Sequence, residues 1–153
     1  MIRVVLTVLV AVALLAASMP AVETARTATT AERLGAETDR LERAIAGVVS
    51  GSTPVSDPAM AAGTTVLLRV PTGFAAAETD RVALVGSAGG PGGVALAYRI
   101  DGGPKRTLRV GTGPAETAVD IVGGPIELRP GPNRIRIRYV DDGGPTVRIG
   151  RIG

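Results

Sequence analysis

The sequence contains no cysteine, no histidine and no tryptophan. Without cysteine the chain has no disulfide, no thiolate metal ligand and no attachment point for a thioether-linked lipid. Without histidine it lacks the commonest general base and a leading metal ligand, and its serines have no imidazole to activate them. We therefore expect a protein that is not an enzyme and that holds no catalytic site, cofactor or metal.

Aromatic side chains are almost as scarce, since Phe74, Tyr98 and Tyr139 are the complete set. A core must then be built from Val, Ile, Leu and Ala, which bury less area per residue than rings. Proteins that bind single-stranded nucleic acid stack its bases on exposed aromatic side chains. Because three rings are too few, and are expected to be buried, we predict no nucleic-acid partner.

Glycine (21 residues) and proline (11 residues) are abundant, as in short strands joined by tight turns. The tripeptide Gly-Gly-Pro occurs at residues 89–91, 102–104, 123–125 and 143–145. Glycine tolerates positive φ, and proline removes a hydrogen-bond donor from a strand. No phosphate-binding motif of the GxxxxGK(S/T) or GxGxxG type accompanies these tripeptides, so we interpret them as turns.

The N-terminal segment, residues 1–22, is predicted to be a transmembrane anchor or signal-anchor. Residues 4–19 carry no charge, and the apolar run continues to Val22 across Pro20. At about 1.5 Å per helical residue, the run is long enough to cross the roughly 30 Å of hydrocarbon in a bilayer. Thr7 is compatible with lipid because its hydroxyl can bond to a carbonyl one turn earlier. We predict that residues 2–22 contact the membrane lipid bilayer.

Charge predicts the orientation of this anchor. Arg3 and the α-amino group precede the apolar run, which favours a cytoplasmic N-terminus and an extracellular C-terminal domain. A cleaved secretory signal is the alternative, because the small residues Ala16-Ala17-Ser18 are typical of a cleavage region. Pro20 lies just after that point and the run is long for a signal. A single-pass anchor in the cell membrane is therefore favoured, while cleavage would give a secreted protein.

Residues 23–49 are predicted to form an amphipathic stalk helix. Leu34, Leu41 and Ile45 lie on one helical stripe, and charged residues occupy the other faces. The stripe is a candidate interaction surface with two interpretations. It packs on the β domain of the same chain, which we favour, or it forms a short coiled coil with a partner helix.

Residues 50–63 contain two prolines and are interpreted as a linker. From residue 64 the apolar pattern alternates, and residues 64–153 are predicted to form one β domain. Its candidate strands are Thr65–Val70, Arg81–Val85, Val94–Ile100, Arg106–Val110, Ala118–Val122, Ile126–Arg129, Arg134–Val140 and Thr146–Ile152. About eight short strands separated by turn residues are typical of a small antiparallel β-sandwich. The fold class of the whole chain is therefore predicted to be α+β.

The clearest alternation lies late in the chain, where Arg134, Arg136 and Arg138 share one face of a strand and apolar side chains share the other. The favoured interpretation is a solvated edge strand that its charges keep from aggregating. An acidic partner is the alternative, with Arg148 and Arg151 contributing from a neighbouring strand.

Two resemblances add to this reading. Residues 128–133 have the pattern Leu-x-Pro-Gly-x-Asn, which resembles late corners of many extracellular β-sandwich modules and implies a fold only. The start MIRVVLTVLVAVALLAASMPAVETAR, the charged helix with spaced leucines, the proline-containing linker and the Gly/Arg-rich β tail resemble a haloarchaeal family of unknown function. That family is encoded near type IV pilus-like secretion ATPases and membrane platform proteins. The resemblance implies membrane association and an accessory role in a surface filament system.

The layout is also similar to type IV pilins, in which an apolar helix continues into an amphipathic one beneath a β sheet. Only Met1-Ile2-Arg3 precedes the apolar run, and the early glutamate of pilins is missing, so we expect no pilin leader. Two functions follow. The first is a non-enzymatic membrane-anchored surface protein, an accessory component of an archaeal type IV pilus-like or secretion assembly with membrane or pilus-assembly proteins as partners. The second is an exported β-sandwich module that binds a surface glycan or another acidic ligand.

Overall fold

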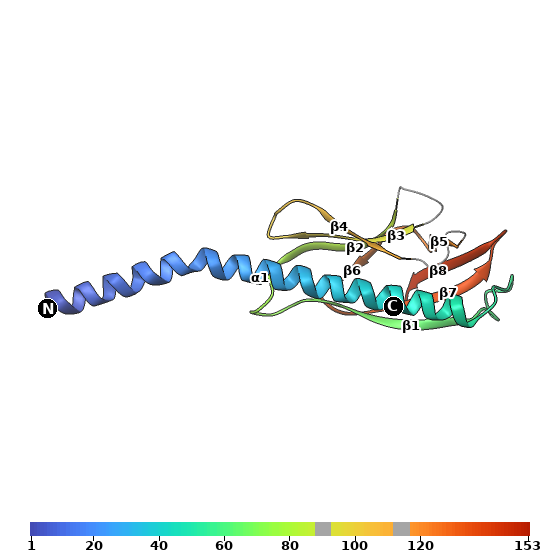
Figure 1. Cartoon of the computed structure of the whole chain (residues 1–153), viewed down its shortest axis with the longest axis horizontal. Coiled ribbons are helices and arrows are strands. Elements are labelled where there is room, and N and C mark those ends of the chain that lie inside the picture. The colour runs from blue at the N-terminus through green and yellow to red at the C-terminus, as the bar shows by residue number, and fades with distance from the viewer. Residues whose placement is uncertain (88–92, 112–116) are drawn as a thin grey trace.

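The computed structural model describes residues 1–87, 93–111 and 117–153. Over these residues the chain begins with one long helix, α1 (Ile2–Gly51), and continues into eight strands in two four-stranded sheets. The chain is therefore α+β, as predicted. About half of α1 projects from the β domain, and the other half lies along it (Figure 1).

The projecting half of α1 is apolar on all sides. Among the residues that the structure describes, α1 is the one helix long and apolar enough to cross a membrane, and none of its apolar segment is buried. Thr7 Oγ1 donates to the carbonyl oxygen of Arg3 at 2.8 Å, as predicted. Pro20 lies inside the helix, whose axis bends gently between its two halves (Figure 1).

The first sheet has the strand order β1–β7–β8–β5, and the second has the order β4–β3–β2–β6. The strands are β1 (Gly63–Val70), β2 (Thr79–Ser87), β3 (Gly93–Ile100), β4 (Arg106–Val110), β5 (Ala118–Ile121), β6 (Ile126–Leu128), β7 (Gly131–Asp141) and β8 (Pro145–Arg151). Every predicted strand is present. Neighbouring strands run antiparallel except β5 and β8, which pair in parallel. Between these two strands the chain crosses to the second sheet as β6 and returns to the first sheet as β7.

Three of the Gly-Gly-Pro tripeptides form turns. Residues 102–104 join β3 to β4, residues 123–125 join β5 to β6, and residues 143–145 join β7 to β8. Gly102 and Gly123 have φ of +65° and +82°, a region that glycine adopts without steric cost. The turn interpretation is confirmed for these three, and the tripeptide at residues 89–91 lies outside the described residues.

The corner between β6 and β7 carries the chain from one sheet to the other. Asn133 is buried there, and its Oδ1 accepts a hydrogen bond from the N–H of Arg129 at 2.9 Å. Its Nδ2 donates to the carbonyl oxygens of Arg129 and Gly131 at 2.7 and 3.0 Å. One amide side chain therefore satisfies backbone groups that the change of sheet would leave unpaired, and the predicted corner is confirmed.

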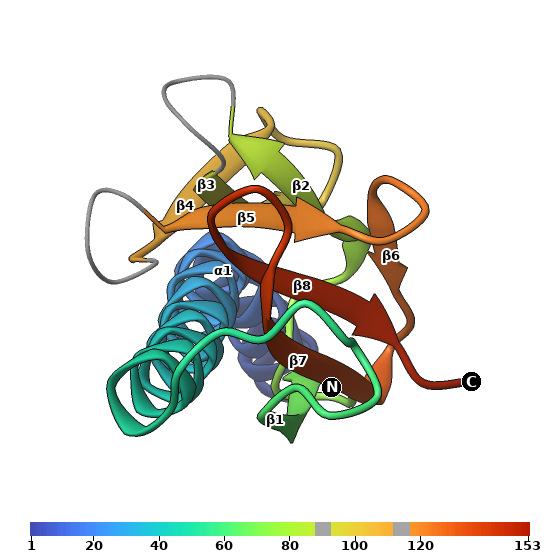
Figure 2. The same cartoon turned by 90° about the vertical axis from the view of Figure 1, so that its right-hand side faces the viewer.

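The second half of α1 closes the side of the sandwich between the edge strands β1 and β4 (Figure 2). Its buried side chains are Thr30, Leu34, Thr38, Leu41 and Ile45. Their spacing of three or four residues places them on one stripe, which joins the inward-facing residues of both sheets in a single core.

Helix side chains also bond to the backbone at these two edges. Glu37 Oε2 accepts a hydrogen bond from the N–H of Arg69 on β1 at 3.1 Å. Glu42 Oε2 accepts one from the N–H of Gly111, directly after β4, at 3.1 Å. Because free amides at a sheet edge pair readily with another chain, these carboxylates help α1 to protect both edges.

The segment predicted as a linker is held against the first sheet. Val55 forms a parallel bridge with Val140 of β7. The N–H groups of Asp141 and Tyr139 donate to the carbonyl oxygens of Val55 and Ala62 at 3.0 and 2.9 Å. The segments that the sequence divided into stalk, linker and β domain therefore pack as one unit beyond the projecting half of α1.

Candidate functional site

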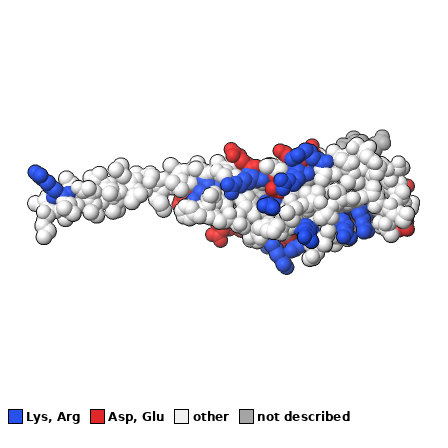
Figure 3. All heavy atoms as spheres, turned by 90° about the horizontal axis from the view of Figure 1, so that it is seen from below, with Lys and Arg blue, Asp and Glu red and all other residues white. Residues whose placement is uncertain are grey.

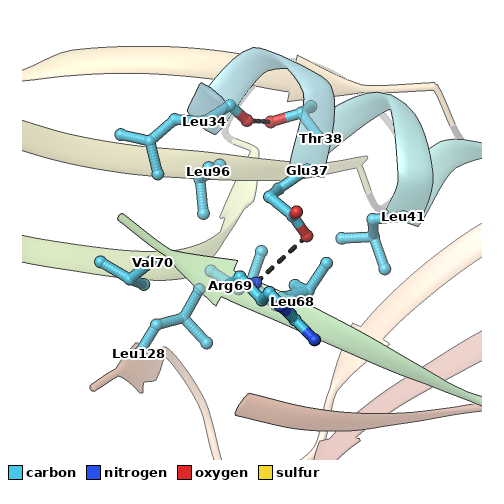
Figure 4. A pocket seen from close by; sticks show the side chains of 10 residues that line it. Leu34, Glu37, Thr38, Leu41, Leu68, Arg69, Val70, Leu96 and Leu128 are labelled. Atoms are coloured by element: carbon cyan, nitrogen blue, oxygen red, sulfur yellow. Dashed lines mark hydrogen bonds between the residues drawn. The ribbon is translucent and has the colours of Figure 1, made fainter. Parts of the chain in front are cut away.

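The apolar stripe of α1 is used inside the chain. Leu34 and Leu41 are 1% exposed, and Ile45 is 0% exposed. Figure 4 shows Leu34 and Leu41 pointing from the helix toward side chains of both sheets, among them Leu68 and Leu128. The favoured interpretation, packing on the chain's own domain, is confirmed. These three side chains, proposed as an interaction surface, are not accessible to a partner helix.

The space between helix and sheets is too small for a ligand. Its volume is about 10 Å³, and leucine side chains form most of its lining (Figure 4). A single water molecule needs roughly 10–15 Å³ and several polar partners. This space is therefore a packing interface, and a binding site has to be sought on the surface.

The predicted arginine row lies on the outer face of the first sheet. Arg134 and Arg136 are exposed and Arg138 is half-buried, while Ile135 and Ile137 between them are 0% exposed. Their strand, β7, pairs with β1 on one side and with β8 on the other. The edge-strand interpretation is therefore wrong, because β7 is an inner strand and its arginines protect no free edge.

The residues opposite the row on β1 carry no negative charge. Across β1 the three arginines pair, in order, with Leu67, Thr65 and Gly63. A Cβ at Gly63 would lie 2.6 Å from the carbonyl oxygen of Ile137 and 3.2 Å from Cγ of Arg138, so glycine makes room for that arginine. Among the described residues, no carboxylate forms a salt bridge with any of the three guanidinium groups.

The two arginines expected beside the row, on β8, are already engaged. Arg148 Nη2 lies 2.6 Å from Asp142 Oδ2, and its Nε lies 3.8 Å from Asp120 Oδ2. Arg151 donates from Nη1 to the carbonyl oxygen of Glu127 at 3.3 Å, toward the second sheet. Of these five arginines, the three on β7 are the ones that form no salt bridge with any carboxylate that the structure describes.

Shallow hollows flank the row on both sides. One, of about 500 Å³, is lined by Pro58, Gly150, Arg136 and Arg138 among others. The other, of about 310 Å³, is lined by Thr65 and the same two arginines. Successive arginines two positions apart on a strand are about 7 Å apart. Figure 3 shows Lys and Arg gathered over the domain, whereas the projecting helix is uncharged except near its N-terminal end.

The two adjacent carboxylates at the turn between β7 and β8 have structural partners. Asp141 and Asp142 lie at the β7–β8 turn, where Asp141 Oδ1 accepts a hydrogen bond from the N–H of Gly144 at 2.9 Å and Asp142 binds Arg148. Within the described parts of the chain, no group of three potential ligands is placed to hold a metal ion. The arginine row is therefore the best candidate for a functional surface.

One aromatic residue lies where the sequence did not predict it. Tyr98 and Tyr139 are buried, as expected, but Phe74 is 90% exposed at the tip of the β1–β2 loop. The Cζ atom of Arg26 lies 4.4 Å from the centroid of its ring. Neither the helical nor the alternating period applies in a loop, so no sequence signal distinguished this ring from a core residue.

A family model described as a domain of unknown function, DUF7311, matches residues 1–152. The chain belongs to the DUF7311 family. No curated protein and no solved structure matches it. The match extends from the apolar segment to the end of β8, so the DUF7311 unit includes the projecting helix as well as the sandwich. This extent agrees with a helix that is part of the core rather than an appendage.

Proposed function

We propose that this DUF7311 chain is a non-enzymatic, single-pass membrane protein that displays its β domain on the outer side of the cell membrane. The exposed apolar half of α1 supports the anchor. Arg3 and the α-amino group at its start support a cytoplasmic N-terminus. Because α1 continues unbroken into the core, the anchor holds the domain near the bilayer without a flexible tether.

In this proposal Arg134, Arg136 and Arg138 bind an acidic surface on a neighbouring protein of a type IV pilus-like or secretion assembly. The observation that supports it is a row of guanidinium groups on an inner strand, where no free edge needs protection and where no described carboxylate forms a salt bridge with them. Arginine binds carboxylates through two parallel hydrogen bonds, and a rigid sheet holds the three groups in register. The assembly itself is suggested by the resemblance to the haloarchaeal family.

An acidic surface glycan is the second candidate ligand. The regular step of about 7 Å between arginines favours it, because a polymer repeats its charges along an extended chain. The open hollows beside the row also suit an extended ligand better than a small enclosed one.

The test replaces Arg134, Arg136 and Arg138 together with serine in the full-length membrane protein. Partners are captured by cross-linking in membranes and counted after solubilisation. We expect recovery of the partner to fall at least about tenfold, because charge-assisted hydrogen bonds are lost. The unfolding transition should be nearly unchanged, since surface substitutions away from structural contacts have small effects.

The matched control replaces Arg81, Arg99 and Arg109 with serine, which removes the same charge from the outer face of the second sheet. Equal recovery with both triple variants would contradict the proposal. Capture of an acidic polysaccharide rather than a protein by the unaltered chain, and its loss in the β7 variant, would identify the glycan as the ligand.

A further inference from the structure

Two loops lie at the end of the domain that faces the projecting helix. The β1–β2 loop (residues 71–78) and the β3–β4 loop (residues 101–105) both reach beside α1 where the helix leaves the domain (Figure 1). We infer that these loops form a second membrane contact, in which Phe74 enters the headgroup layer and Lys105 and Arg106 bind lipid phosphates. This inference rests on the proposed membrane anchor and is independent of the arginine row on β7.

Hydrogen bonds hold the β1–β2 loop against the helix and the β3–β4 loop against the β1–β2 loop. Thr30 Oγ1, which is buried, accepts a hydrogen bond from the N–H of Ala77 at 2.9 Å. The carboxylate of Asp101 accepts one from the N–H of Glu78 at 3.1 Å, and its Oδ2 lies 3.5 Å from Thr27 Oγ1 of the helix. Asp101 adopts φ of +47°, a left-handed conformation that aspartate tolerates. The loops and one turn of α1 therefore form a single platform.

The position of Phe74 along the helix matches the interfacial layer. Arg26, which lies against the ring, follows Val22 by four residues, or about 6 Å of helix axis. Headgroups add roughly 5–7 Å on each side of the hydrocarbon. When the run that ends at Val22 spans the hydrocarbon, the ring of Phe74 lies within the headgroup layer.

The chemistry of the platform also suits a lipid surface. Interfacial elements combine an exposed apolar ring with nearby Lys or Arg. Phe74 is 90% exposed, and Lys105, the last residue of the adjacent loop, and Arg106, the first residue of β4, are exposed as well. Arg106 lines one surface hollow together with Pro20 and Glu23 of α1, so its side chain lies beside the end of the apolar run.

Two of the four acidic residues of the platform accept hydrogen bonds from the backbone. Asp80 Oδ2 accepts a hydrogen bond from the N–H of Gly102 at 2.8 Å, and Asp101 holds the loops together as described above. Glu23 and Glu78 are the other carboxylates at this end. Lys105 and Arg106 are both exposed at this end of the domain, where anionic headgroups would lie.

The absence of tryptophan allows a direct test, because Phe74→Trp places a single fluorophore at the loop tip. The full-length variant is reconstituted in vesicles of phosphatidylcholine and phosphatidylglycerol whose acyl chains are brominated near the glycerol backbone. We expect at least twofold quenching and a blue-shifted emission. Met60→Trp is the matched control, because Met60 is 78% exposed in the segment after α1, at the opposite end of the domain, and it should stay unquenched.

A second reference, Leu9→Trp, places the fluorophore in the apolar run and, in vesicles brominated toward the methyl ends of the acyl chains, reports the anchor alone. Quenching of Leu9→Trp with none in Phe74→Trp would overturn the loop contact and leave the anchor intact. Loss of quenching at both positions would overturn both. In the Phe74→Trp background, Lys105→Glu with Arg106→Glu should lower quenching to the level seen in pure phosphatidylcholine, and unchanged quenching would contradict the role of the two cations.

Discussion

The two halves of α1 share one secondary structure and differ in what surrounds them. In residues 2–22, apolar side chains cover every face and none is buried by the chain. From Thr30 onward, the buried side chains keep to one stripe, and charged residues cover the rest of the surface. A bilayer contacts a helix on all sides, whereas a β domain covers one side. The pattern of apolar residues around a helix therefore indicates which surroundings it requires.

The largest expected effect is on the stability of the domain, which should depend on the packed half of α1 and not on the projecting half. Leu41→Ala should lower the free energy of unfolding by about 2–5 kcal/mol, because it leaves a cavity between helix and sheets. Leu9→Ala removes the same atoms from the projecting half and should leave this free energy unchanged. Urea unfolding of the full chain in detergent, followed by circular dichroism, measures both. Similar losses in the two variants would break the comparison.

A charge in the projecting half should affect membrane insertion instead. Leu9→Arg places a guanidinium near the centre of the apolar run, at a cost of about 2.5–3.5 kcal/mol for insertion. Ala36→Arg adds the same group to an exposed position in the packed half and should insert normally. The fraction resistant to alkaline extraction of membranes is the measurement. Normal membrane retention of Leu9→Arg would argue against a transmembrane role for this segment.

The smallest expected effect tests the polar contacts of the packed half. Glu37→Gln weakens the charge-assisted bond to the N–H of Arg69 and removes the ion pair with Arg40. We expect a loss of about 0.5–1.5 kcal/mol in the free energy of unfolding. Glu32→Gln changes an exposed carboxylate on the same helix and serves as the control. If both variants unfold alike, the carboxylate of Glu37 adds nothing to docking of the helix.

Much of this architecture could be predicted because it is local. The sequence pattern located each strand, and in β7 its alternation also identified the buried face, as Ile135 and Ile137 illustrate with 0% exposure. The same alternation says nothing about neighbouring strands, so the row that starts at Arg134 was assigned to an edge although β7 lies inside its sheet. The parallel pairing of β5 with β8 escaped prediction for the same reason.

Two further differences arose in segments without periodicity. The prolines of residues 50–63 indicated a linker, yet Val55 and Ala62 accept hydrogen bonds from β7. Proline is compatible with an extended segment beside a strand when its missing N–H faces away from the pairing. Phe74 was expected in the core because it is apolar, but its loop holds it beside Arg26 at the surface. Composition alone does not place a residue whose backbone follows no repeating pattern.

By itself the sequence determined an apolar helix of membrane-spanning length, the presence of each strand, the buried face of β7 and the positions of the described turns. These features depend on side-chain periodicity and on backbone preferences over a few neighbouring residues. Only the tertiary structure decided that the stripe of α1 closes the sandwich, that β7 is an inner strand and that Phe74 lies at the end nearest the projecting helix. Each of these depends on contacts between residues far apart in the chain, whose energies exist only after folding brings them together.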